Sequence, residues 1–204
     1  MKKITLSFKI LTVFALSLML FSCNPVEKET DSGSFLIIES ITGKDNLGND
    51  SSIVFSDVIT NGQVYSDFVT VTLQTATLDP NPIMGVSQYS DIMLTNYVVT
   101  YIRSDGATVE GTDVPYHFEG TLSQLVPVGS SVSFPLIIVK DTAKNQAPLN
   151  TLVGTTEVLE CHATIEFIGH DLRNRGVRQT GQITVRFADF VDEAGGEEEE
   201  EGGE

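Results

Sequence analysis

The segment from Leu159 to Phe167 alternates strictly between apolar and polar side chains. Its odd positions are Leu159, Cys161, Ala163, Ile165 and Phe167, and its even positions are Glu160, His162, Thr164 and Glu166. Residues 183–187 repeat the pattern with Ile, Val and Phe. A period of two predicts a strand with one buried and one solvated face. Two such strands in succession predict an antiparallel hairpin packed over a core.

The same kind of sequence continues through most of the chain. Stretches rich in Val, Ile, Thr, Phe and Tyr are separated by Gly, Asn, Asp and Pro, and no stretch has a sustained period of 3.6. The predicted strands are 35–41, 53–59, 67–78, 92–104, 114–125, 131–140, 158–169 and 181–190. Residues 141–156 do not alternate and are expected to cross between sheets or cap one end. We predict an all-β fold, an antiparallel β-sandwich of about seven to nine strands formed by residues 35–191.

The first 22 residues read as an export signal. Lys2, Lys3 and Lys9 precede an apolar run from Ile10 to Phe21, which is too short to span a bilayer permanently. Residues 20–23, Leu-Phe-Ser-Cys, resemble the bacterial lipobox, and the resemblance implies cleavage before Cys23 and lipidation of that cysteine. Two or more acyl chains would hold the protein stably on a membrane. The alternative is an ordinary secretory signal with an incidental cysteine.

The segments on either side of the predicted sandwich look unable to form a core. Residues 23–34 have Val26 as their single apolar side chain after the cysteine, and we expect a flexible tether of up to about 36 Å. Residues 192–204 carry eight of the acidic residues, and 195–204 are Gly and Glu alone. Such a segment buries too little apolar surface to offset the entropy of ordering, so a disordered acidic tail is predicted.

The charge of the chain argues against nucleic acid as a partner. The formal net charge is −16, with 12 basic and 28 acidic residues. Removing residues 1–22 takes away three lysines and no acids, which leaves −19. A polyanion binds by releasing counterions to a cationic surface, which this chain lacks.

Several segments resemble a known group of proteins. These are residues 101–107 (YIRSDGA), 113–120 (DVPYHFEG), 143–149 (AKNQAPL) and 187–190 (FADF), together with the hairpin 165–185. They are similar to bacterial lipoproteins of unassigned function, and the hairpin resembles the last two strands of bacterial immunoglobulin-like domains. The resemblance spans about 35–191 and implies an immunoglobulin-like β-sandwich. It carries no known active site.

No motif for catalysis, a metal or a cofactor is found. Gly-rich phosphate loops, zinc-ligand spacings and nucleophile elbows are absent from the sequence. His162 and His170 are about 26 Å apart along a strand, too far to share a metal. Residues 44–50 supply oxygen ligands but place Leu47 at a ligand position, so a polar turn competes with a cation site. Cys161 is expected to be buried and inert.

The loop between the last two strands is the candidate ligand contact. Residues 170–180 are expected to project as a hairpin loop, since Asn174 and Gly176 tolerate positive φ. The candidate residues are Asp171, Arg173, Asn174, Arg175 and Arg178. Arginines pair with planar anions such as carboxylates, sulfates and phosphates of glycans or lipid headgroups. In the alternative, the loop pairs with the protein's own acids.

Three functions remain open from the sequence. The first is a non-enzymatic, lipid-anchored binding or structural module of the bacterial cell envelope, with a protein or polysaccharide partner met at loops or edge strands. The second is a glycan- or cell-surface-binding accessory protein, for which Tyr65, Tyr89 and Tyr116 are the available stacking groups. The third is a hydrolase using a carboxylate pair. Asn24 is not the aspartate of inner-membrane retention, so the outer membrane is the expected destination.

Overall fold

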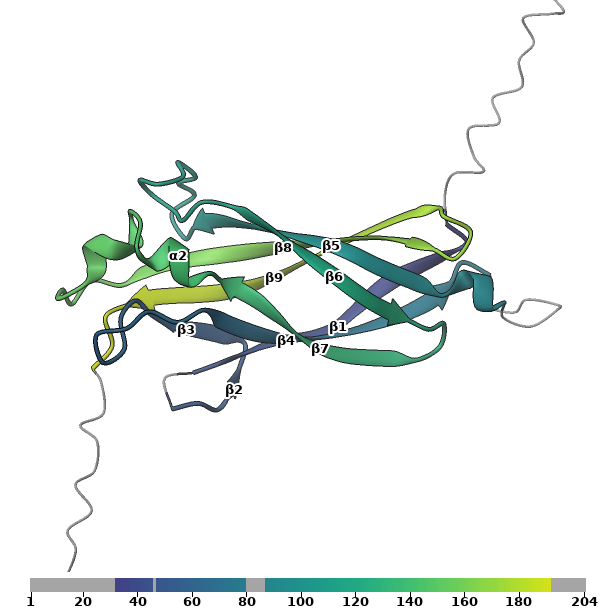
Figure 1. Cartoon of the computed structure of the whole chain (residues 1–204), viewed down its shortest axis with the longest axis horizontal. Coiled ribbons are helices and arrows are strands. Elements are labelled where there is room, and N and C mark those ends of the chain that lie inside the picture. The colour runs from purple at the N-terminus through teal and green to yellow at the C-terminus, as the bar shows by residue number, and fades with distance from the viewer. Residues whose placement is uncertain (1–31, 46, 80–86, 192–204) are drawn as a thin grey trace, which may run out of the picture. The chain divides into compact units, whose positions relative to one another are not determined.

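The computed structural model describes residues 32–45, 47–79 and 87–191, all of which belong to one unit that begins at Ser32. Two β-sheets packed face to face make up this unit (Figure 1). The predicted signal peptide (1–22), the lipidation site Cys23, most of the predicted tether and the acidic tail (192–204) lie outside the described residues.

The first sheet has four strands and the second has five. In spatial order the first contains β2 (Asp50–Ser51), β1 (Ser34–Lys44), β4 (Asp67–Thr77) and β7 (Ser131–Val139). The second contains β3 (Ile53–Asp57), β9 (Gly176–Ala188), β8 (Leu159–Asp171), β5 (Ile92–Arg103) and β6 (Phe118–Val126). Three short helices, η1 (Gln88–Ser90), α2 (Asp141–Lys144) and η2 (Leu149–Leu152), lie in the connections.

This arrangement confirms the predicted immunoglobulin-like antiparallel β-sandwich. Strands β1, β4 and β7 in one sheet face β5, β8 and β9 in the other, which repeats the A, B, E against C, F, G division of immunoglobulin-like folds. Residues 141–156 connect β7 to β8 across the two sheets through α2 and η2, as expected. One pairing departs from the prediction, because β3 runs parallel to β9.

Some strand limits also differ from the prediction. The strand expected at 114–125 begins only at Phe118, because residues 111–113 form a turn, in which the Gly111 amide donates to the Val114 carbonyl at 2.8 Å, and residues 115–117 belong to no strand. The sandwich begins before Phe35: Ser32 and Ser34 are buried, and Ser34 is the first residue of β1. The last residues of the predicted tether therefore belong to the folded unit.

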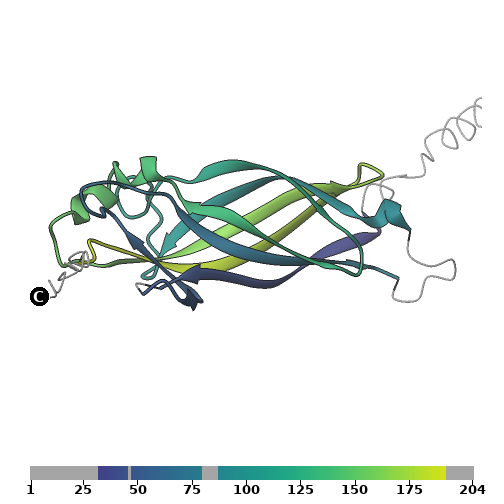
Figure 2. The ribbon, with the colours of Figure 1, turned by 60° about the horizontal axis from the view of Figure 1, so that its bottom comes forward.

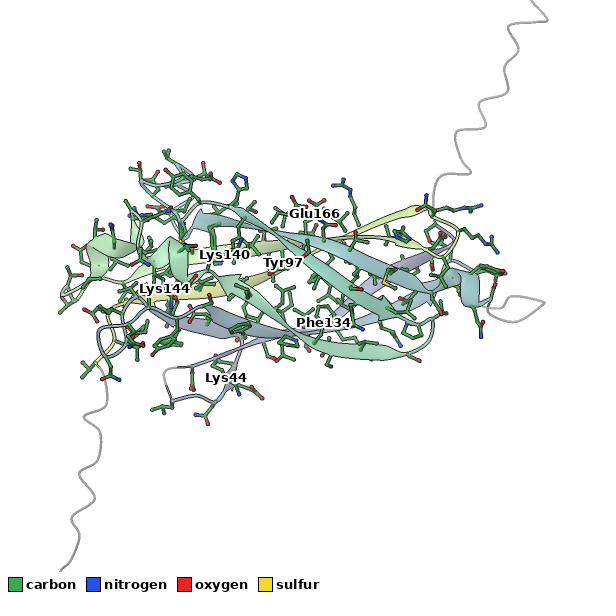
Figure 3. All side chains as sticks on the ribbon, viewed as in Figure 1. Lys44, Tyr97, Phe134, Lys140, Lys144 and Glu166 are labelled. Atoms are coloured by element: carbon green, nitrogen blue, oxygen red, sulfur yellow. The ribbon has the colours of Figure 1, made fainter. Side chains whose placement is uncertain are left out.

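The core lies between the two sheets and comes from the alternating positions. Phe167 of β8 and Phe187 of β9 are fully buried, and each such side chain contributes up to about 3 kcal/mol. Tyr97 and Tyr101 of β5 share the inward face, and the Tyr101 hydroxyl donates to the Ile138 carbonyl. Figure 3 shows Tyr97 and Phe134 between the sheets.

Cys161 is part of this core. Its side chain has no exposed surface, which confirms the prediction that it is buried. Burial raises the pKa of the thiol to about 12, because the thiolate would lose its hydration there.

Candidate binding surfaces

The hairpin that joins β8 to β9 is tighter than predicted. The turn contains Leu172–Arg175 alone, because His170 and Asp171 belong to β8 and residues 176–180 belong to β9. Asn174 has φ of 64°, the left-handed conformation expected of asparagine in a turn. The expectation of a projecting loop over 170–180 is therefore wrong, since strand pairing continues as far as His170 and Gly176.

Asp171 holds this turn together. One carboxylate oxygen, Oδ1, accepts the backbone N–H groups of Arg173 and Arg175, both at 2.9 Å. The other, Oδ2, accepts the Ser32 hydroxyl at 3.1 Å. The residue is only 2% exposed. The prediction that Asp171 contacts a ligand is corrected accordingly, because its carboxylate oxygens accept hydrogen bonds from backbone and side-chain donors inside the protein.

The three arginines of the predicted site lie in two places. Arg173 is exposed at the turn, with its Cζ 5.9 Å from the centroid of the Tyr89 ring, while Arg175 is half-buried beside it. Arg178 is exposed on β9, where its guanidinium pairs at 2.8 Å with Glu166 of β8, which Figure 3 labels. Asn174 is exposed at the tip. The turn therefore presents Arg173, Asn174 and Arg175 together, and Arg178 is paired with one of the protein's own acids.

A groove runs between one edge of each sheet. It has a volume of about 520 Å³ and is lined by residues 35–41 of β1 and 179–182 of β9. Within the described ranges, no strand pairs with the outer edge of β1 before Gly43, and none pairs with the outer edge of β9 before Thr184. Both walls of the groove are consequently uncovered strand edges, which carry backbone donors and acceptors without a ladder partner.

Gly181 shapes the floor of this groove. A Cβ atom at Gly181 would come within 2.7 Å of the Cδ1 atoms of both Ile38 and Ile41. Because Gly181 has no side chain, these isoleucines from the first sheet reach across to the second and close the core beneath the groove. Phe35 and Ile37 alternate with the buried residues and remain 41% and 36% exposed. Among the described residues that line the groove, Glu39 alone is charged.

A second cavity of about 420 Å³ lies at the end of the sandwich that carries α2 and η2. Its lining includes Arg103, Asp105, Asp113, Glu157 and Glu160. Arg103 pairs with Asp105 at 3.1 Å, and Glu160 pairs with Arg186 at 2.6 Å. The lining is polar, and two of its carboxylates are already engaged by arginines.

The other residues considered from the sequence are accounted for locally. The Asp45 carboxylate accepts the backbone N–H groups of Leu47 and Asn49, and the bond from Asn49 is the main cause of its lowered pKa, which agrees with a polar turn. His162 is exposed on β8, as predicted, with its ring 3.3 Å from the Thr184 hydroxyl. In the ranges that the structure covers, no group of three or more His, Cys, Asp or Glu residues is placed to hold a metal ion.

One charged pair was missed by the sequence reasoning. The Lys144 ammonium, 2% exposed, donates to the Asp57 carbonyl at 2.7 Å and to Asp67 at 3.1 Å. Burial raises the pKa of Asp67 even though Lys144 stands beside it. The pair ties α2 to the start of β4, at the end of the sandwich where Figure 3 labels Lys144. No sequence signal marks it, since Lys144 lies in a stretch without periodicity.

Comparison with known proteins leaves the chain unassigned. No family model matches it, and no curated protein matches it. Among solved structures, one from the Northeast Structural Genomics Consortium aligns with a TM-score of 0.30 and 10% identity, over 78% of this chain and 88% of that chain. The sporulation control protein Spo0M of Bacillus subtilis aligns with a TM-score of 0.29 and 15% identity, over 76% of this chain and 49% of its own. No helix among the described residues is long and apolar enough to cross a bilayer.

Proposed function

We propose that the protein is a lipoprotein of the bacterial cell envelope, anchored by acyl chains on Cys23, whose sandwich is a non-enzymatic binding module. Its partner is another protein, which docks an extended, mainly apolar segment into the groove between β1 and β9. The outer membrane is the proposed location. The observation that carries the binding role is that two uncovered strand edges face the same groove.

Strand edges favour this kind of partner for a physical reason. An extended segment that pairs with β1 or β9 gains main-chain hydrogen bonds from the edge and places alternate side chains against the groove. Phe35 and Ile37 supply exposed apolar surface for those side chains. Glu39 directs one carboxylate oxygen to the Ser131 hydroxyl on β7, at 2.9 Å. With Glu39 as the one charged side chain among its described lining residues, the groove carries little charge for so acidic a protein, which favours a mainly apolar segment.

The two alternative functions have weaker support. The tyrosines available for stacking on a glycan are exposed but dispersed: Tyr89 is in η1 at the hairpin end, whereas Tyr116 precedes β6 at the other end. For a hydrolase, a pair of buried carboxylates would be required. Among the described residues, Asp171 is buried and is occupied by the hairpin turn, while the largely buried Asp67 is paired with Lys144. We therefore propose no catalytic residue, cofactor or metal.

Site-specific photo-crosslinking in intact cells tests the groove. A photoreactive phenylalanine analogue is placed at Phe35, in the groove, and separately at Phe68, which is 53% exposed on the same sheet but outside the groove. We expect a discrete protein adduct from position 35 and none from position 68. Phe35→Lys together with Ile37→Lys should reduce binding of the captured protein at least tenfold, because edge lysines oppose strand pairing. Phe68→Lys is the matched control.

Other outcomes of this experiment would contradict the proposal. Identical adducts from positions 35 and 68 would show that the groove has no special role. An adduct made of two copies of this chain would make the groove a self-association surface. Turnover of any substrate in a panel of esterase, peptidase and glycosidase assays, lost on mutation of a residue in this domain, would overturn the non-enzymatic part.

The anchor is tested separately. Treatment of cells with globomycin, or the change Cys23→Ala, should block cleavage before residue 23, so that a longer precursor that still carries residues 1–22 accumulates. If processing and membrane partitioning are unchanged, the lipid anchor is wrong, whatever the groove binds.

A further inference from the structure

The chain enters the sandwich beside the β8–β9 hairpin. The Ser32 hydroxyl donates to Asp171 at 3.1 Å, and the Ser34 hydroxyl donates to the carbonyl of Ser90, the last residue of η1, at 2.6 Å. These bonds hold the first residues of the folded unit at the side of the sandwich that carries the hairpin turn and η1. Figure 1 and Figure 2 show the hairpin and η1 at one end of the strands and α2 at the other.

The length of the chain before Ser32 limits how far this end can be from an anchor. Nine residue steps separate Cys23 from Ser32, and a fully extended chain covers them in about 32 Å at most. β8 has 13 residues and spans about 43 Å, so the α2 end is farther away by roughly that length. An acyl anchor at Cys23 therefore keeps the hairpin end near the membrane.

The hairpin end presents side chains suited to a lipid headgroup layer. We define the hairpin tip as Tyr89, Leu172, Arg173 and Arg175. Tyr89 is 62% exposed and Leu172 is 44% exposed, and the Arg173 guanidinium lies over the Tyr89 ring. Aromatic rings and long cationic side chains place apolar parts at the acyl boundary and polar ends in the headgroups. Arginine also binds phosphate oxygens in a bidentate manner.

Two of the acids near the hairpin tip accept hydrogen bonds within the protein. Asp171 is buried in the turn, and Asp91 accepts the Val128 N–H at 2.9 Å. At the α2 end, the cavity lining includes Asp113 and Glu157 in addition to the paired Arg103 and Asp105. An anionic membrane surface would attract the arginines of the hairpin tip and repel the carboxylates of Asp113 and Glu157.

We propose that the hairpin tip lies against the headgroup layer of the membrane that holds Cys23, and that Arg173, with Arg175 beside it, binds lipid phosphate. This inference rests on the anchor of the proposed function and not on the groove. It orients the molecule, with its strands rising from the membrane and the acidic end of the sandwich presented away from it.

Tryptophan fluorescence tests the orientation, since the chain contains no tryptophan. Leu172→Trp places a probe at the hairpin tip, and Val153→Trp places one at the α2 end, where Val153 is also 44% exposed. Each full-length lipidated protein is reconstituted into vesicles of phosphatidylethanolamine and phosphatidylglycerol that contain brominated lipid. We expect a blue shift and quenching for Leu172→Trp and neither for Val153→Trp. Adding Arg173→Glu to Leu172→Trp should weaken tip association by at least the factor of about five that one arginine contributes at an anionic surface.

The outcomes separate the anchor from the orientation. If the lipidated protein floats with the vesicles but position 172 is quenched no more than position 153, the anchor stands and the orientation is overturned. If the protein does not float, the anchor fails and this inference falls with it. If inorganic phosphate alone shifts the emission of Leu172→Trp without vesicles, the tip is a free-phosphate site and the membrane proposal is overturned.

Discussion

Asp171→Ala should destabilise the sandwich more than any other single change to an acidic side chain in the β8–β9 hairpin. The substitution removes an acceptor that satisfies two backbone N–H groups and one hydroxyl. Hydrogen bonds to a charged acceptor contribute about 1.5 kcal/mol or more each. The two backbone bonds alone therefore predict a loss of about 3 kcal/mol in the free energy of unfolding. In a domain of this size that lowers the Tm by about 6 to 12 °C.

Urea unfolding followed by far-UV circular dichroism measures this change in a chain lacking residues 1–22 and carrying Cys23→Ser. Asp171→Asn should lose about half as much, because the amide oxygen still accepts both backbone N–H groups but without the charge. Asp50→Ala is the control, since Asp50 is 77% exposed and its pair with Lys44 contributes at most about 1 kcal/mol. An Asp171→Ala protein within 0.5 kcal/mol of the parent would refute the structural role assigned to this carboxylate.

Two further predictions concern buried ionisable groups. In the folded Cys23→Ser chain, Cys161 should not react with a thiol reagent at pH 8, because a pKa of about 12 leaves about one thiolate in ten thousand. In urea, where the side chain is no longer buried, it should react fully. Fast labelling of the folded protein would contradict this prediction. Since that pKa is raised, the thiol destabilises the fold only as the pH rises beyond its ordinary value of 9.0. Lys144→Ala should lower the free energy of unfolding in urea by about 3 kcal/mol, because it leaves the Asp67 carboxylate without its charged partner. Lys44→Ala, the control at an exposed pair, should change it by no more than about 0.5 kcal/mol. Equal effects would show that burial of the Lys144 pair is unimportant.

The fold was largely accessible from the sequence. Strands β8 and β9 follow directly from alternation, because side chains on a strand point to opposite faces with a period of two, and one face of each sheet is buried. The crossing role of residues 141–156 followed from the loss of that alternation. Local pattern was insufficient where turns interrupt it, as before β6, whose predicted start at Val114 was four residues too early because a buried valine looks the same in a turn as in a strand.

The candidate sites were much less accessible. The arginines of the hairpin were found by composition, but whether Asp171 faced solvent depended on Ser32, 139 residues away in the chain. The groove exists because parts of two strand edges have no neighbouring strand. On β9 this is so because β3 pairs only with residues 184–188 and leaves the earlier residues of that edge uncovered. No local pattern carries this information.

The amino-acid order alone was enough to define an all-β sandwich, an acidic character that disfavours nucleic acid, and a chain that carries a resemblance to lipoproteins at its start. Those properties depend on neighbours in the chain, on periodicity and on composition. Three-dimensional packing was needed to bury Asp171 and Lys144, to leave two strand edges open around Gly181, and to bring the chain entry to the arginine turn. Such properties depend on contacts between residues distant in sequence, which are specified only when the whole sandwich closes.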